Sequence, residues 1–171
     1  VFGATQGLWE VRKSFEWPQE GFELVYEVQL KNLGAAPATG ELGVHYARAI
    51  DARREQKPSF FGAVGNVSTA ACYASVDKGP EMFRQVPDEE KPKSEHQGQV
   101  HFFGIDQQYF LAAVFPLEGA RAGRCVLSGT KDARTADAFF PVSVGPGETI
   151  SQRFVVFIGP KDDSLLPTVP T

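Results

Sequence analysis

The sequence predicts an all-β fold, an antiparallel β-sandwich of about ten strands. Most of the ordered segments alternate apolar and polar residues, which is the period of a strand with one buried face. Turn residues, chiefly Gly and Pro, separate these segments, and no long apolar pattern of helical period appears. The 171 residues contain 14 Phe and 42% hydrophobic residues, which suffices for one domain with a buried core.

The first fifty residues predict a hairpin followed by a third strand. The segments "LWEVRKSFEW" (8–17) and "FELVYEVQL" (22–30) both alternate, and the turn residues "PQEG" (18–21) join them. The third strand is "ELGVHYARAI" (41–50). Together with two later strands, these segments predict an inward-facing set: Phe22, Leu24, Tyr26, Val28, Tyr109, Phe154 and Val156.

The middle of the chain, from Asp51 to Gln99, has a weaker pattern. Short strands are predicted at 63–67 and 70–76, and the polar segment "VPDEEKPKSEHQG" (86–98) predicts an exposed loop.

Strand patterns return in the last third of the chain. The run 99–119 predicts two strands with a tight turn near Gly104–Gln107. Further strands are expected in "RCVLSGTK" (124–131), "AFFPVSV" (138–144) and "TISQRFVVFIG" (149–159), and only the last dozen residues could be helical.

The charge pattern and the motifs exclude several classes of function. A formal net charge of −4 gives no reason to expect nucleic acid or an anionic membrane surface as a partner. No apolar stretch is long enough to span a membrane, and the start at Val1 fits a mature or excised fragment. The three histidines, His45, His96 and His101, lie on different segments without metal-ligand spacing. We therefore expect no catalytic residues, no metal and no cofactor.

The two cysteines, Cys72 and Cys125, match no zinc or CxxC motif. Two alternatives remain open from the sequence. Either both are buried thiols, or they form one disulfide, which requires an oxidising compartment.

Two further short segments, "GIDQQYF" and "GPKDD", predict a turn and a helix start. In "GIDQQYF", residues 106–108 predict a polar hairpin turn that leads into a core strand at Tyr109 and Phe110. In "GPKDD", the strand ends at Gly159-Pro160, and Asp162 or Asp163 is expected to cap a short helix by accepting hydrogen bonds from its first amides.

These segments resemble motifs of the large periplasmic domain of YidC-type membrane protein insertases of Gram-negative bacteria. The family pattern Q-Y-F-x-x-A-x-x-P is matched at 108–116, and the family's "P-G-E" turn at 146–148. The terminal G-P-K-D-x-x-L-L pattern is matched at 159–166. The resemblance runs from about Gly7 to Leu166, although 51–99 match poorly. Its residues are Gln108, Tyr109, Phe110, Pro116, Gly159, Pro160, Lys161, Asp162, Leu165 and Leu166.

The resemblance implies a β-supersandwich similar to the galactose mutarotase fold, on the periplasmic side of the inner membrane. It implies a single noncatalytic domain, 1–171, cut from a larger membrane protein and lacking the N-terminal part of the family's domain. Residues 160–171 are then a junction toward the following transmembrane helix. The implied partners are Sec translocon accessory subunits and nascent membrane proteins.

The alternative is a carbohydrate-binding or aldose-epimerase-like protein of the same fold. An epimerase needs a histidine acid and a carboxylate base that converge in one cleft, and the scattered histidines do not favour it.

Overall fold

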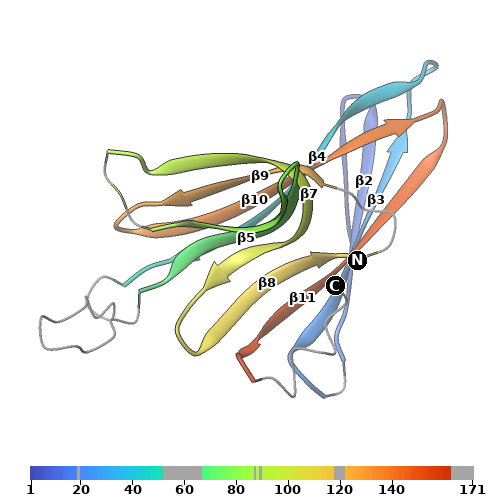
Figure 1. Ribbon diagram of the computed structural model, residues 1–171. Helices are drawn as coiled ribbons and strands as arrows, with labels where there is room; N and C mark the ends of the chain where they lie inside the picture. The colour runs from blue at the N-terminus through green and yellow to red at the C-terminus, as the bar shows by residue number, and fades with distance from the viewer. Residues whose placement is uncertain (19, 52–66, 87, 89, 118–121, 163–171) are drawn as a thin grey trace, which may run out of the picture.

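The computed structural model describes residues 1–18, 20–51, 67–86, 88, 90–117 and 122–162, which form eleven β-strands (Figure 1). The strands are β1 (Phe2–Gln6), β2 (Trp9–Glu16), β3 (Glu23–Asn32), β4 (Ala38–Ala49), β5 (Thr69–Val76), β6 (Gly79–Gln85), β7 (Lys93–Asp106), β8 (Phe110–Pro116), β9 (Ala122–Gly129), β10 (Ala133–Val144) and β11 (Thr149–Pro160). These residues contain no helix, and hence none that is long and apolar enough to cross a membrane.

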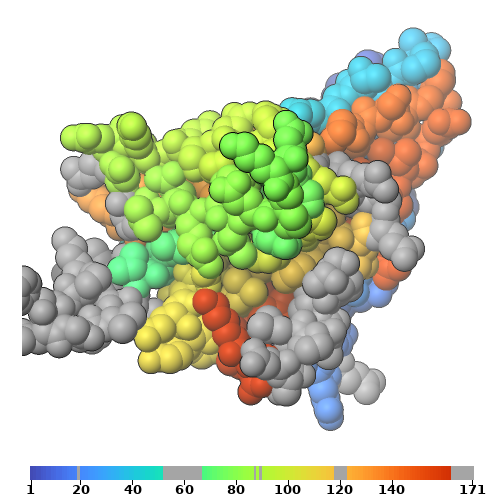
Figure 2. Space-filling model, viewed as in Figure 1, coloured from blue at the N-terminus to red at the C-terminus, as the bar shows by residue number. Residues whose placement is uncertain are grey.

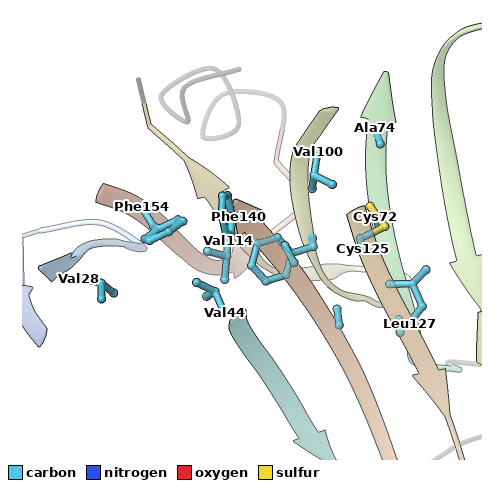
Figure 3. Packing of buried hydrophobic residues seen from close by; sticks show 14 of the residues in the cluster. Val28, Val44, Cys72, Ala74, Val100, Val114, Cys125, Leu127, Phe140 and Phe154 are labelled. Carbon is cyan, nitrogen blue, oxygen red and sulfur yellow. A yellow bond between two sulfur atoms is a disulfide. The ribbon is translucent and has the colours of Figure 1, made fainter. Parts of the chain in front are cut away.

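The strands form one antiparallel sheet in the order β1-β2-β3-β11-β8-β7-β9-β10-β4, and the β5–β6 hairpin pairs with β7 outside this path. The sheet curls, so that β4 at one end faces β3, β11 and β8. The main core lies between the two facing halves, where Val44 of β4 packs in one cluster with Val28, Val114 and Phe154 (Figure 3). The predicted all-β sandwich is therefore confirmed.

A second, smaller core covers the opposite face of β8 and β11. It contains Ala113 and Phe115 of β8 and Val155 and Phe157 of β11. Because both faces are covered where these strands pair, their sequences at 110–116 and 154–160 are almost continuously apolar and do not alternate.

The disulfide alternative is the one present in the structure, where Cys72 and Cys125 are bonded and fully buried (Figure 3). Cys72 lies on β5 and Cys125 on β9. The bond thus ties the β5–β6 hairpin, which is outside the main strand path, to a second strand of the sheet.

The predicted inward-facing set is wrong at two residues. Phe22 is 45% exposed and Tyr109 is 64% exposed, whereas Val28 and Phe154 are fully buried. Phe22 precedes β3 and Tyr109 lies in the β7–β8 turn. Both side chains therefore stand beyond the end of the strand that would have buried them.

The prediction of a loop at 86–98 is also wrong in its second half. Lys93–Gly98 belong to β7, and this part of the strand pairs with β9. Its exposed residues alternate with half-buried ones, so the segment is polar because one face meets solvent. Strands β1 and β6 were not predicted either, and residues 63–66 of a predicted strand lie outside the described residues.

The predicted C-terminal helix cannot be compared with the structure. Strand β11 runs to Pro160, one residue further than expected. Lys161 and Asp162 follow it without helical structure, and residues 163–171 lie outside the described residues.

Candidate functional site

Three segments that are distant in sequence meet at one end of the molecule, the lower end in Figure 1. Antiparallel pairing places the start of β3 opposite Phe157 and the start of β8 opposite Pro160, so both strands begin where β11 ends. Four large apolar side chains are exposed there, and we call them the apolar end surface: Phe22, Tyr109, Phe110 and Ile158. Figure 2 shows β8 in yellow and the end of β11 in red, close together at the molecular surface.

Backbone hydrogen bonds hold this end together. The Lys161 N–H donates to the Tyr109 carbonyl over 2.8 Å, and the Ile158 N–H donates to the Phe22 carbonyl over 2.9 Å. The β7–β8 turn is closed by the Gln107 N–H, which donates to the Phe110 carbonyl over 3.0 Å. The chain is therefore fixed in direction as far as Lys161.

An ion pair supports the same arrangement. The Lys161 ammonium contacts the Asp106 carboxylate, whose other oxygen lies 3.4 Å from Nε of Arg84. Asp106 is mostly buried, so its two cationic neighbours offset part of its desolvation. The ion pair ties the end of β11 to the end of β7.

Gly159 has a clear packing role. A Cβ atom at this position would lie 2.7 Å from Cγ of Phe22 and 2.9 Å from Cζ of Phe157. The rings of Phe22 and Phe157 meet edge to face, with centroids 6.3 Å apart. The glycine is therefore required because Phe22 lies directly over the backbone of β11.

A groove of about 430 Å³ opens beside this surface, between the second half of β4 and the ends of β8 and β11. Its lining is mostly apolar, with Gln107 and Arg48 as the polar members: Phe22, Tyr46, Ala47, Arg48, Gln107, Phe110, Leu111, Ala112, Ile158 and Gly159. Burial raises the pKa of the Tyr46 phenol, and the positive charge of Arg48 opposes this shift. The Arg48 guanidinium makes no ion pair or hydrogen bond in the described structure.

The structure thus brings together the two motifs on which the family resemblance rests. Tyr109 and Phe110 lie beside Pro160 and Lys161, whereas Pro116 lies at the far end of β8, opposite Phe154. Gln108 donates from Nε2 to the Tyr109 hydroxyl over 3.1 Å. Asp162 is exposed, and Leu165 and Leu166 lie outside the described residues.

Sequence reasoning missed four residues of this end: Phe22 and Ile158 as exposed side chains, and Tyr46 and Arg48 as groove residues. Alternation does place Ile158 on the core face of β11. No local pattern, however, brings β4 opposite β8 and β11, because that contact depends on how the whole sheet curls.

The histidines remain separate in space, but one of them has a carboxylate partner that the sequence did not indicate. His45 of β4 contacts Asp137 of β10 through Nδ1, and the imidazole is largely exposed. His101 lies 2.6 Å from the Ser75 hydroxyl, and His96 stacks on Phe83 at 3.9 Å, where burial lowers the pKa of its imidazole. In the described part of the chain, no three potential ligands are grouped to hold a metal ion.

Comparison with solved structures defines the fold class as galactose mutarotase-like. A putative aldose 1-epimerase from Escherichia coli K12 superimposes with a TM-score of 0.59 at 11% identity, over 92% of this chain and 63% of that one. A galactose mutarotase related enzyme from Lactobacillus acidophilus gives a TM-score of 0.57 at 8% identity, over 91% and 63%. At such low identity, the likeness concerns the fold alone.

Within this fold class, the chain belongs to the family of YidC periplasmic domains, whose model matches residues 2–171. It is 30% identical over 162 residues to the membrane protein insertase YidC of Anaeromyxobacter dehalogenans strain 2CP-1, and 28% identical over 166 residues to that of Anaeromyxobacter sp. strain Fw109-5. Both matches cover 95% of this chain but only 28% of the relative's length. As a YidC periplasmic domain, the chain lies on the periplasmic side of the inner membrane.

Proposed function

We propose that this chain is a noncatalytic domain of a membrane protein insertase, and that it supports insertion and folding of inner-membrane proteins through contacts with partners or substrates. The observation that carries the proposal is the apolar end surface of Phe22, Tyr109, Phe110 and Ile158. Grouped exposed aromatic and aliphatic side chains are typical of surfaces that bind other proteins. The family to which the chain belongs supplies the insertase context.

The partners of this surface are Sec translocon accessory subunits and nascent membrane proteins. A nascent membrane protein presents long apolar segments, and an aromatic surface removes such segments from water.

The junction is part of the same proposal. Residues 160–171 lead toward a transmembrane helix, and Lys161 starts this connection in a fixed direction through its contacts with Tyr109 and Asp106. In this proposal, the apolar end surface lies at the same end of the domain as the start of the junction.

Crosslinking in cells tests the proposal. A photoreactive phenylalanine analogue is placed at Tyr109 of the full-length protein, and the control has the same analogue at Leu33. Leu33 is a comparably exposed residue just beyond the opposite end of β3. We expect crosslinks to a Sec accessory subunit or to a nascent membrane protein from position 109, well above those from position 33. Equal yields from both positions, or crosslinks to neither partner, would contradict the proposal.

Two observations bear on the alternative of an aldose-epimerase-like protein. The fold is that of the mutarotases, and the structure contains the His45–Asp137 pair on the outer face of β4 and β10. In that pair, however, the two groups bind each other. An epimerase needs an acid and a base that reach a sugar from different sides.

We therefore expect no mutarotase activity. Polarimetry of freshly dissolved α-glucose and α-galactose with the purified chain should give the buffer rate, because His45 and Asp137 contact each other and are not placed on two sides of a substrate. The same measurement on the His45→Asn variant is the control. A rate above that of buffer that disappears in His45→Asn would reverse this conclusion.

A further inference from the structure

We propose that the Cys72–Cys125 disulfide exchanges with external thiols or disulfides only when the β5–β6 hairpin lifts from the sheet, and that Phe83 of β6, stacked on His96 of β7, closes the hairpin over it. The bond is then made before the hairpin closes and is protected afterwards. None of these four residues belongs to the apolar end surface or to the groove beside it, so the inference does not rest on the proposed function.

The bond lies inside the main core, out of reach of other sulfur atoms. Both cysteines have an exposed fraction of 0%, and they belong to the same buried cluster as Ala74, Val100 and Leu127 (Figure 3). Thiol–disulfide exchange begins when a thiolate attacks one of the two bonded sulfur atoms and forms a mixed disulfide. Since the thiolate needs direct access to that sulfur, the closed fold does not permit the reaction.

Four side chains form a closed ring of neighbours around the bond. Cys72 lies directly opposite Phe83 in the β5–β6 pair, and Cys125 lies directly opposite His96 in the β7–β9 pair. Directly opposite residues of antiparallel strands share one face of the sheet, so each ring flanks one cysteine. The Phe83 and His96 rings stack with centroids 3.9 Å apart. Because both rings are half-buried and both cysteines are fully buried, the stack lies between the bond and solvent.

The β5–β6 hairpin is the most weakly attached part of the structure around the bond. Within the described sheet, β6 pairs with β5 alone, and β5 pairs outside the hairpin with β7 alone. The β5–β7 register also shifts between Tyr73 and Ala74, which interrupts the ladder. In contrast, β9, which carries Cys125, is paired on both sides, with β7 and β10. Proteins open locally in such units at a lower cost than global unfolding, and lifting the hairpin separates the stacked rings and uncovers Cys72.

The exchange needs only a thiol or a disulfide as the second reactant. In reduction, an external thiolate attacks the sulfur of Cys72, the S–S bond breaks, and Cys125 leaves as a thiolate that takes up a proton. The second thiol of a dithiol reductant then attacks its own first sulfur and releases Cys72. The cystine has gained two electrons, and the dithiol has become a disulfide. Oxidation is the reverse, with an external disulfide as electron acceptor, and in the oxidising periplasm it acts on the chain before the hairpin closes.

Reduction by dithiothreitol under native conditions tests the inference in the 171-residue chain. The free thiols are alkylated with iodoacetamide and counted by mass. We expect the folded wild type to be reduced at least about a thousandfold more slowly than the urea-unfolded chain, because the open form is a small fraction of the molecules. Phe83→Ala should accelerate reduction of the folded chain about thirtyfold, since a half-buried ring is removed from the stack.

A second variant separates the stack from the other packing of Phe83. His96→Ala removes the other ring of the stack and leaves the phenyl ring against the main core, so it should also accelerate reduction. The double variant should be reduced more slowly than the product of the two single effects predicts, because both single variants lose the same stack.

Phe154→Ala is the matched control, since it removes the same type of ring from a position between other strands. Phe154 lies on β11, is fully buried, and has aromatic contacts with Tyr26 and Phe140. This variant is expected to lower the free energy of global unfolding while the hairpin keeps its contacts. Its reduction rate should therefore stay within about twofold of the wild-type rate.

Three results would overturn the inference. Reduction of the folded wild type as fast as that of the unfolded chain would mean that the bond is not shielded. Unchanged rates in both Phe83→Ala and His96→Ala would mean that the stack does not close the hairpin. An acceleration in Phe154→Ala that matches its loss of global stability would mean that the whole chain has to unfold. If Phe83→Ala does not fold, the rate of His96→Ala alone decides about the stack.

Discussion

Replacing Cys72 and Cys125 together by alanine is expected to lower the free energy of unfolding by about 4 kcal/mol. The disulfide closes a loop with a sequence separation of 53 residues, and the chain-entropy model gives this magnitude for such a loop. We expect almost the whole of this loss in unfolding free energy to be observed, because the bond connects β5 to β9 and these strands do not pair with each other. Without it, β7 is the only described strand outside the hairpin that is hydrogen-bonded to the β5–β6 hairpin, and the rest of the attachment is side-chain packing in the main core.

Two measurements check this expectation. Urea denaturation compares the double alanine variant with the wild type under oxidising conditions, and the reduced wild type serves as a control with unchanged side-chain volume. Thiol titration of the unreduced, denatured wild type should find no free thiol. Two titratable thiols per chain would exclude the bond, and a stability equal to that of the wild type would exclude its contribution.

The sequence predicted the fold best where apolar and polar residues alternate plainly, and it missed the polar half of β7 at 93–98, where few residues are apolar. Alternation at 8–17 and 22–30 predicts β2 and β3 correctly, and the turn residues between them predict the hairpin that the structure contains. The pattern failed at Phe22 and Tyr109, because alternation gives the face of a residue but not the point at which the neighbouring strand ends.

The candidate site was predictable only in part, for a related reason. The residues of the two family motifs were available from the sequence, and the structure adds that Tyr109 and Lys161 are hydrogen-bonded neighbours. Tyr46 and Arg48 could not be found in this way, since they come from β4, at the other end of the strand order. Their position depends on the curl of an entire sheet, which no window of sequence contains.

Phe154 is the residue that we expect to contribute most to holding the two facing halves of the curled sheet together. Its side chain is fully buried, stacks on Tyr26 of the neighbouring strand β3 with centroids 5.7 Å apart, and meets Phe140 of β10 edge to face at 5.2 Å. Tyr26 belongs to the same half of the sheet as Phe154, whereas Phe140 belongs to the facing half. The ring therefore packs the two halves against each other.

The Phe154→Ala variant is expected to lose about 4 kcal/mol of unfolding free energy, from lost burial, from the cavity left between the halves and from two lost aromatic contacts. Urea denaturation measures this as a lower midpoint with an unchanged dependence on denaturant. The matched control is Phe2→Ala, the same substitution on the edge strand β1, where the ring is 69% exposed and contacts Phe15. It should cost no more than about 1 kcal/mol. Equal losses in the two variants would mean that Phe154 does not hold the facing halves of the sheet together. The groove beside Ile158, which depends on the same two halves being packed together, would then not be a fixed feature of the fold.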